Sequence, residues 1–262
     1  MKATKGFRIW QILYPIGLYY VISSLMYFVL ELMMGDDNST YMFRQMICSA
    51  ATIPAILSFY RQDQKAEDIV FGALDKKISK KRVEEVLLAV LAAGTLGIAV
   101  NNVIAMTPLM QRSEGFAEAN AAFFAGGMGM ELLASGLVVP IAEELLFRGV
   151  VYKRIRLYLG VYPALVLSAL LFGVIHVNLV QFLYATILGL LLAFLLEKTR
   201  RLSVAVIGHM AANIIAVVRA ETGWLDFSYQ ADAAGIGFTL LMAVLAAGIC
   251  WYLWREYRQI NQ

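Results

Sequence analysis

Two adjacent carboxylates and a guanidinium interrupt the apolar stretch VVPIAEELLFRGVVY, residues 138–152. Glu144 and Arg148 are four residues apart, so on a helix they share a face and can form an ion pair. Glu143 lies about 100° further round such a helix and is free to face a different neighbour. Pro140 lacks a backbone N–H and predicts a distortion of the helix just before the acidic pair. The spacing therefore indicates one paired and one unpaired carboxylate.

Both histidines of the chain also lie in apolar stretches. His176 follows Phe172 by four residues in FGVIH, and His209 precedes Asn213 by four residues in HMAAN. On helices, each pair would share a face. Ionisable groups at mid-bilayer cost at least ~2.5–3.5 kcal/mol, and they persist where they face one another or a water-filled cavity. The three stretches can therefore meet at one hydrated site.

Hydrolysis of an amide bond fits such a set of residues. A carboxylate aided by a neutral imidazole can take a proton from water and direct the hydroxide to a carbonyl carbon. A second imidazole and an amide NH2 can donate to the oxyanion that forms. The ion pair would hold Glu144, which leaves Glu143 as the base. No Ser or Cys accompanies the histidines at a spacing that favours a covalent nucleophile.

Several alternatives remain open from the residues alone. Glu143, His176 and His209 would make a catalytic zinc shell with an open position for water, although the H-E-x-x-H pattern is absent. The acidic–basic pair can be a purely structural ion pair, and the histidines can be packed or interhelical polar groups. Glu and His chains also serve proton-coupled transporters, but the broken, repeated spans typical of transporters are absent from the sequence.

The composition predicts a membrane protein. Of 262 residues, 60% are hydrophobic and only 16% are charged, and the mean hydropathy is +0.69. Runs of about 20 apolar residues can cross a bilayer as helices. Eight apolar runs are present, at residues 10–34, 41–59, 84–106, 128–152, 161–177, 179–197, 202–219 and 235–254. The predicted fold is an all-α polytopic bundle of about eight transmembrane helices, forming a single membrane domain over 1–262.

The basic residues predict the orientation of the bundle. With both termini cytoplasmic, 19 of the 22 Lys and Arg residues fall on the inner side, and only Arg44, Arg112 and Arg219 fall outside. This asymmetry follows the positive-inside rule. The lysine-rich segment Ala66–Arg82 is either an amphipathic helix along the inner membrane surface or a solvated loop.

The N-terminus, the two cysteines and the basic residues exclude several other classes of protein. The basic N-terminus is followed by an apolar stretch of more than 20 residues, which predicts an uncleaved first span rather than a signal peptide. Cys48 and Cys250 lie in apolar runs and are expected to be buried thiols. Because the basic residues follow the topology rule, they give no indication of nucleic-acid binding.

The three polar motifs resemble those of a known family. EELLFRG (143–149), FGVIH (172–176) and HMAAN (209–213) are similar, in order, to the E-E-x-x-x-R, F-x-x-x-H and H-x-x-x-N motifs of the CPBP intramembrane proteases. This family, also called Abi, covers CaaX proteases and bacteriocin-processing proteins, including the Ras-converting type of CaaX endoprotease. The similarity spans residues 128–219, the predicted catalytic core. The site residues that it implies are Glu143, Glu144, Arg148, His176, His209 and Asn213.

The resemblance also implies their roles. Glu143 would activate water with help from His176, while Glu144 and Arg148 would support the site. The histidine and asparagine of the third motif would form the oxyanion pocket. Members are often described as metalloproteases, but this glutamate mechanism requires no cofactor, and zinc is the alternative.

The expected function is therefore an intramembrane endopeptidase that cleaves a membrane-associated protein or peptide. The substrate would be a CaaX-type prenylated protein or a peptide pheromone or bacteriocin precursor. The expected location is a membrane, crossed several times, and the cell membrane if the protein is prokaryotic. The alternatives are a non-catalytic scaffold or bacteriocin self-immunity protein of the same fold and, behind it, a proton-coupled transporter.

Overall fold

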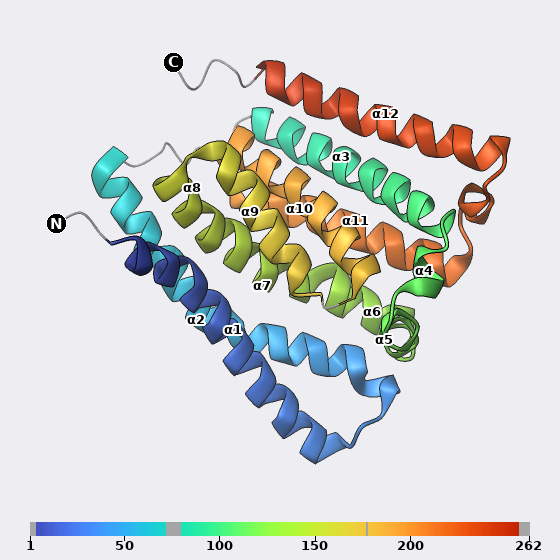
Figure 1. Ribbon diagram of the computed structural model, residues 1–262, viewed down its shortest axis with the longest axis horizontal. Helices are drawn as coiled ribbons and strands as arrows, with labels where there is room; N and C mark the ends of the chain where they lie inside the picture. The colour runs from blue at the N-terminus through green and yellow to red at the C-terminus, as the bar shows by residue number, and fades with distance from the viewer. Residues whose placement is uncertain (1–3, 72–79, 177, 257–262) are drawn as a thin grey trace.

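The computed structural model describes residues 4–71, 80–176 and 178–256, and in these ranges the chain is helical with no β-strand (Figure 1). The α-helices are α1 (Lys5–Met34), α2 (Tyr41–Phe71), α3 (Lys80–Ala105), α4 (Leu109–Arg112), α5 (Phe116–Phe123), α6 (Met128–Leu133), α7 (Val139–Leu146), α8 (Lys153–Leu159), α9 (Val161–Val174), α10 (Leu179–Thr199), α11 (Leu202–Thr222) and α12 (Ala233–Glu256). Two short 3₁₀ turns, η1 (Asn38–Thr40) and η4 (Asp226–Tyr229), and two π-helical turns, η2 (Ala134–Val138) and η3 (Phe147–Tyr152), complete the elements.

The predicted all-helical membrane fold is confirmed. Six helices in the described part of the chain are long and apolar enough to cross a bilayer: α1, α2, α3, α10, α11 and α12. They pack into a bundle in which most helices run roughly along one common direction (Figure 1). The protein is therefore a multi-pass membrane protein.

The helices at the eight predicted spans differ in length. In the described part of the chain, all eight apolar runs fall mainly on helical segments. Six helices are long and apolar enough to cross a membrane by themselves, and the run at 128–152 adds a seventh if its bent unit is taken as one span. The remaining run, at 161–177, forms α9, which has only 14 residues. At 1.5 Å per residue that helix is about 21 Å long, shorter than the ~30 Å hydrocarbon core.

The bent unit joins α5 to the continuous helical segment 128–159, and the two parts meet at 101°. The chain turns at Gly127, whose φ of +82° is a conformation that glycine adopts without steric strain. As a result, α5 lies across one end of the bundle, while α6 and α7 run into its interior (Figure 1).

Small residues bring the central helices close together. α3 packs against both α11 and α12, and α9 packs against α10. Ala89, Ala93, Ala205 and Ala212 are fully or almost fully buried where α3 meets α11. Small residues let backbones approach closely, which is the usual way that helices associate in lipid.

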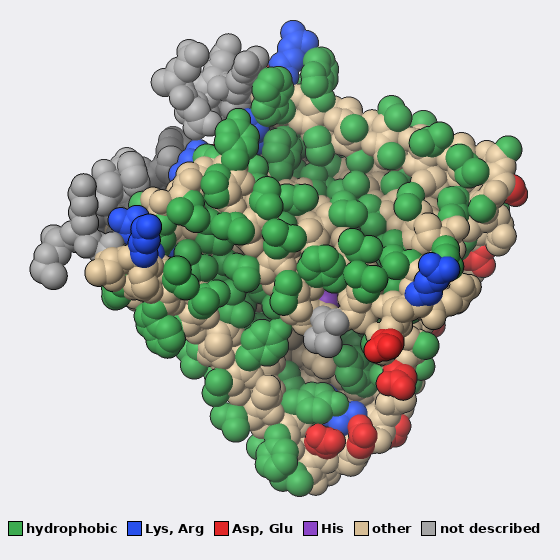
Figure 2. Space-filling model, in the orientation of Figure 1, with side chains coloured by type: hydrophobic (Ala, Val, Ile, Leu, Met, Phe, Trp, Pro, Cys, Tyr) green, Lys and Arg blue, Asp and Glu red, His purple; other side chains and the backbone are tan. Residues whose placement is uncertain are grey.

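The charges lie at the two ends of the bundle. Figure 2 shows hydrophobic side chains over the middle, basic side chains mainly at the end where α1 begins and α12 ends, and acidic side chains at the opposite end. This distribution suits a bundle with an apolar belt facing lipid. The predicted surface helix at 66–82 lies largely outside the described residues; α2 continues as a helix to Phe71.

Candidate active site

The acidic pair lies on α7, between two π-helical turns. Glu143 is 8% exposed and Glu144 is fully buried. Pro140 is the second residue of α7, and the π-helical turn η2 directly precedes this helix. The predicted distortion is therefore present, in the form of a π turn. Such single turns inserted into α-helices are often found at functional sites.

Glu144 joins two of the three motifs. Its Oε1 accepts a hydrogen bond from Arg148 Nη1 at 2.9 Å and another from His209 Nδ1 at 2.9 Å. Arg148 is also fully buried, and its Nη2 donates to the Gly189 carbonyl on α10 at 3.0 Å. The predicted ion pair between Glu144 and Arg148 is confirmed. The same carboxylate also accepts a hydrogen bond from the imidazole of His209.

His209 lies between the two carboxylates. An ionised carboxylate only accepts hydrogen bonds, so Nδ1 of His209 carries the hydrogen that it donates to Glu144. The other ring nitrogen, Nε2, lies 3.8 Å from Oε2 of Glu143. The imidazole described beside Glu143 is therefore that of His209, while the resemblance implied His176 as the helper of this base.

His176 lies just beyond the end of α9. Its Nδ1 is 2.9 Å from the Phe172 carbonyl. A carbonyl accepts, so Nδ1 donates and Nε2 is left as an acceptor. Within the described residues no hydrogen bond joins His176 to Glu143, so assistance between them would require a bridging water molecule.

Phe172 is the packing centre of the site. Its ring makes edge-to-face contacts with His176 at 5.0 Å and with His209 at 5.6 Å between centroids. The guanidinium carbon of Arg148 lies 4.5 Å from the same ring centroid, which is a cation–π distance. The ring of Phe172 thus contacts residues of all three motifs, which lie on different helical segments.

Asn213 completes the set on α11, one turn beyond His209. Its Nδ2 donates to the Ser135 carbonyl in η2 at 2.8 Å. The predicted pair therefore faces the helix that bears the acidic residues, with His209 bonded to α7 and Asn213 bonded to η2. The six predicted residues come together, although no direct hydrogen bond is described between His176 and the other five.

A cavity of about 330 Å³ adjoins these residues. His176, Asn213 and Ser135 line one part of it, and much of the rest is aromatic. Figure 2 shows a hollow on this face with a histidine side chain visible in it. The aromatic residues of the lining are Phe116, Phe123, Phe124, Tyr184 and Tyr229.

Three of these aromatic residues come from α5 and the residue that follows it, a segment that lies between the predicted apolar runs 84–106 and 128–152. The phenylalanines Phe116, Phe123 and Phe124 are the signal that points to a buried face there. Ser135 is a second residue missed from the sequence; its position four residues after Glu131, in an apolar run, gives only a weak indication.

The described residues do not form a metal shell. In ranges 4–71, 80–176 and 178–256, no three His, Cys, Asp or Glu side chains are grouped so that they could hold a metal ion. The zinc set considered from the sequence, Glu143, His176 and His209, is not gathered in that way. Nδ1 of each histidine contacts a protein oxygen, which leaves Nε2 of each ring as the nitrogen that could bind a metal.

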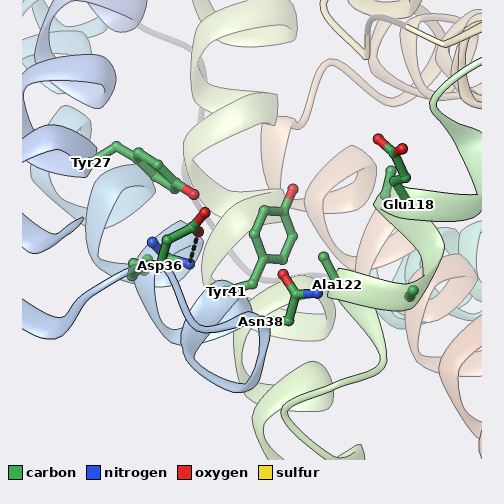
Figure 3. Close-up of a pocket in the computed structure, with 9 residues that line it drawn as sticks. Tyr27, Asp36, Asn38, Tyr41, Glu118 and Ala122 are labelled. Atoms are coloured by element: carbon green, nitrogen blue, oxygen red, sulfur yellow. Dashed lines mark hydrogen bonds and ion pairs between the residues drawn. The ribbon is translucent and has the colours of Figure 1, made fainter.

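A second pocket, of about 500 Å³, lies at the end of the bundle that carries the acidic residues (Figure 3). It is formed by Tyr27 of α1, residues 36–44 and the outer face of α5, including Glu118. None of the predicted site residues lines it. Helix α5 thus separates this polar pocket from the aromatic cavity.

Comparisons with known proteins agree with the motifs. Residues 126–215 match the family model described as "Type II CAAX prenyl endopeptidase Rce1-like". A protein of Bacillus subtilis (strain 168), "Putative membrane peptidase YdiL", is 30% identical over 87 residues. This alignment covers 33% of the present chain and 36% of that protein. No solved structure matches the chain.

The matched segment contains all three motifs and overlaps the predicted core, 128–219. These findings confirm the resemblance to the CPBP/CAAX protease family. The alignment spans about a third of the curated relative. Helices α1 to α3 and α12 lie outside residues 126–215, the segment that the family model matches.

Proposed function

We propose that the protein is an intramembrane endopeptidase of the CPBP type. The observation that carries this proposal is the shared oxygen of Glu144, which binds Arg148 and His209 beside the second carboxylate, Glu143. A structural ion pair alone needs neither an imidazole nor a further carboxylate. Hydrolysis uses both.

The first chemical step is attack of water on a peptide carbonyl. Glu143 takes a proton from the water molecule, and the resulting hydroxide bonds to the carbonyl carbon. Arg148 balances the charge of Glu144, so that Glu143 can act as the base. The proton held by Glu143 then passes to the leaving amine as the C–N bond breaks, which restores the carboxylate.

The tetrahedral intermediate carries an oxyanion that needs hydrogen-bond donors. Asn213 lines the cavity, and the N–H of its amide that is not bonded to Ser135 can be one donor. His209 can donate from Nε2 when both ring nitrogens carry a hydrogen, and the Glu144 carboxylate, which lies 2.9 Å from Nδ1, then faces the charged ring. Nε2 of His176 is an acceptor and can orient the water molecule.

The cavity supports an apolar substrate. Its phenylalanine-lined part adjoins the polar part with His176 and Asn213, so an apolar peptide segment can lie next to the reacting bond. We therefore propose a membrane-associated protein or peptide as the substrate, of the CaaX-type prenylated or pheromone or bacteriocin precursor kind, and the cell membrane as the location in a prokaryote. The mechanism proposed here uses no step through a metal.

The test compares new peptide termini in membranes of cells that carry the wild-type protein, Glu143→Gln or His176→Ala at matched abundance. Removing a general base typically lowers the rate by about 10²–10⁴-fold, so termini found with wild type should be absent with Glu143→Gln. Glu114→Gln, a change of an exposed glutamate outside the site, is the matched control and should leave the termini in place.

Two outcomes would count against the proposal. Cleavage that persists in purified Glu143→Gln protein would contradict its role as the base. Identical termini in all four strains, with the cellular phenotype intact, would favour a non-catalytic scaffold or immunity protein.

A further inference from the structure

The side-chain amide of Asn213 is held by a backbone carbonyl that a regular helix would not offer. Nδ2 of Asn213 lies 2.8 Å from the carbonyl oxygen of Ser135. In an α-helix this oxygen would accept from the N–H of Val139, four residues on. The bond to Asn213 therefore depends on how the chain is wound in η2.

Two features free the Ser135 carbonyl. In the π-helical turn, the Val139 N–H donates to Ala134, five residues back, and not to Ser135. The next N–H in the π register would come from residue 140, which is a proline and has none. Ser135 is thus left without a backbone donor, and a buried carbonyl without a donor is costly. The Asn213 amide supplies the missing hydrogen bond.

Gly136 allows the close approach that this bond needs. A Cβ atom at position 136 would lie 2.9 Å from Cγ1 of Ile214, the residue after Asn213 in α11. Real Cβ atoms essentially never come so close. A larger residue would push η2 away from α11 and lengthen the Ser135–Asn213 bond.

We propose that Pro140, Gly136 and the Ser135 carbonyl are positioning groups for Asn213. The carbonyl takes one of the two N–H groups of the amide, which fixes the plane and the orientation of the side chain. Asn213 lines the cavity together with Ser135 and His176, and the second N–H is the one that remains to donate there. This inference rests on the proposed function, because it assigns a purpose to that second N–H as the donor to the oxyanion.

The first experiment needs no substrate. Hydrogen exchange of the Asn213 side-chain amide is followed by NMR in the full-length protein labelled with ¹⁵N-asparagine, with the signal identified by its loss in Asn213→Asp. Pro140→Ala restores an N–H that can bond to Ser135 directly in the π register, or return Val139 to it in the α register. Exchange should be about tenfold faster in Pro140→Ala, the effect of losing one buried hydrogen bond.

Two variants are the controls for this experiment. Pro54→Ala changes an exposed proline inside α2, and Gly129→Ala adds a methyl group where no atom lies within 4 Å. Both should exchange at the wild-type rate, whereas Gly136→Ala should exchange faster. Equal exchange in wild type, Pro140→Ala and Gly136→Ala would overturn the proposal.

The second experiment uses a peptide that contains a bond cleaved by the wild-type protein in the comparison of termini. Pro140→Ala should lower kcat by about 10–100-fold with KM nearly unchanged, since small displacements of catalytic groups have effects of this size. In the Asn213→Ala background the same change should have no further effect. Additive losses in the double variant would show that Pro140 acts on the fold and not through Asn213.

The two proposals can fail separately. If the wild-type protein cleaves no peptide, the endopeptidase assignment fails, while the exchange experiment still decides whether Ser135 holds Asn213. If wild type is active and Pro140→Ala keeps full kcat, only the positioning role is lost.

Discussion

Arg148 and Arg219 are both fully buried arginines on helices within the bundle, and they are neutralised in different ways. Each guanidinium lies over an aromatic ring, Phe172 at 4.5 Å and Tyr229 at 4.3 Å from the centroid. Arg148 is paired with a carboxylate, Glu144. Among the described residues, Arg219 has no such ion pair.

Arg219 is held by neutral groups. Its Nη2 donates to Asn102 and to Ser228, both at 2.8 Å, and Asn102 in turn donates to Thr239 at 2.9 Å. This network ties α11 to α3, η4 and α12. Among the described residues, no hydrogen bond or ion pair joins this network to a carboxylate or an imidazole, so we infer that the role of Arg219 is to join helices.

The difference between Arg148 and Arg219 shows that a buried charge in a membrane protein can have more than one role. Such a charge marks an expensive group that must be satisfied, but it does not by itself mark catalysis. What distinguishes the Arg148 region is that the partner carboxylate makes a further bond to an imidazole. Arg44, another of the outward arginines, is 1% exposed and has an ion pair with Asp36 at 3.4 Å in addition to bonds to backbone carbonyls. Among the described residues, no hydrogen bond joins Asp36 to an imidazole.

The largest effect is expected for Arg148→Met. This change leaves Glu144 buried and without its counter-charge, which typically lowers the free energy of unfolding by about 3–5 kcal/mol. Cleavage should be lost as well, because Glu144 also orients His209. Denaturant unfolding in detergent and a cleavage assay measure the two effects. If the free energy of unfolding falls no more in Arg148→Met than in Arg219→Met, the proposed difference between the two buried arginines is contradicted.

A smaller effect is expected for Arg219→Met. Asn102 keeps its bond to Thr239 and a contact to Ser228 at 3.3 Å, so the loss should be about 1–3 kcal/mol, that of polar groups left partly unsatisfied. Turnover per folded molecule should equal that of wild type. Strongly reduced turnover with normal folding would show that this region also takes part in the reaction.

The smallest change in stability is expected for the double substitution Glu144→Gln with Arg148→Met. Replacing both members of a buried pair by neutral groups is often neutral or stabilising by about 1–4 kcal/mol relative to the pair, so most of the stability lost in Arg148→Met should return. Cleavage should stay absent. Glu143→Gln with Arg148→Met is the matched control and should not recover, because Glu144 remains unpaired.

Much of this fold follows from the sequence. The eight apolar runs all fall on helices, since lipid leaves a backbone segment few other choices. The meeting of the three motif helices was also predicted, because isolated ionisable groups at that depth would be too costly. Periodicity does not encode the break at Gly127, which places α5 across the end of the bundle and brings its phenylalanines into the cavity.

The contacts of the site were less predictable. The i,i+4 spacing gave the Glu144–Arg148 pair, since both residues lie on one helix. The bonds from His209 to Glu144 and from Asn213 to Ser135 join different helices, and the second depends on a π turn, which has no clear sequence pattern beyond Pro140. The Arg219 network was missed because its partners lie up to 137 residues apart.

The shortness of α9 has a consequence for the surrounding lipid. A helix of about 21 Å beside neighbours long enough to cross leaves a hydrophobic mismatch of nearly a third of the hydrocarbon thickness, and bilayers respond to such mismatch by thinning locally. Because His176 lies just past the end of α9, we expect the headgroup layer to lie closer to it on that side. For the proposed hydrolysis, we therefore expect water to reach the site by a path shorter than the thickness of an undisturbed leaflet.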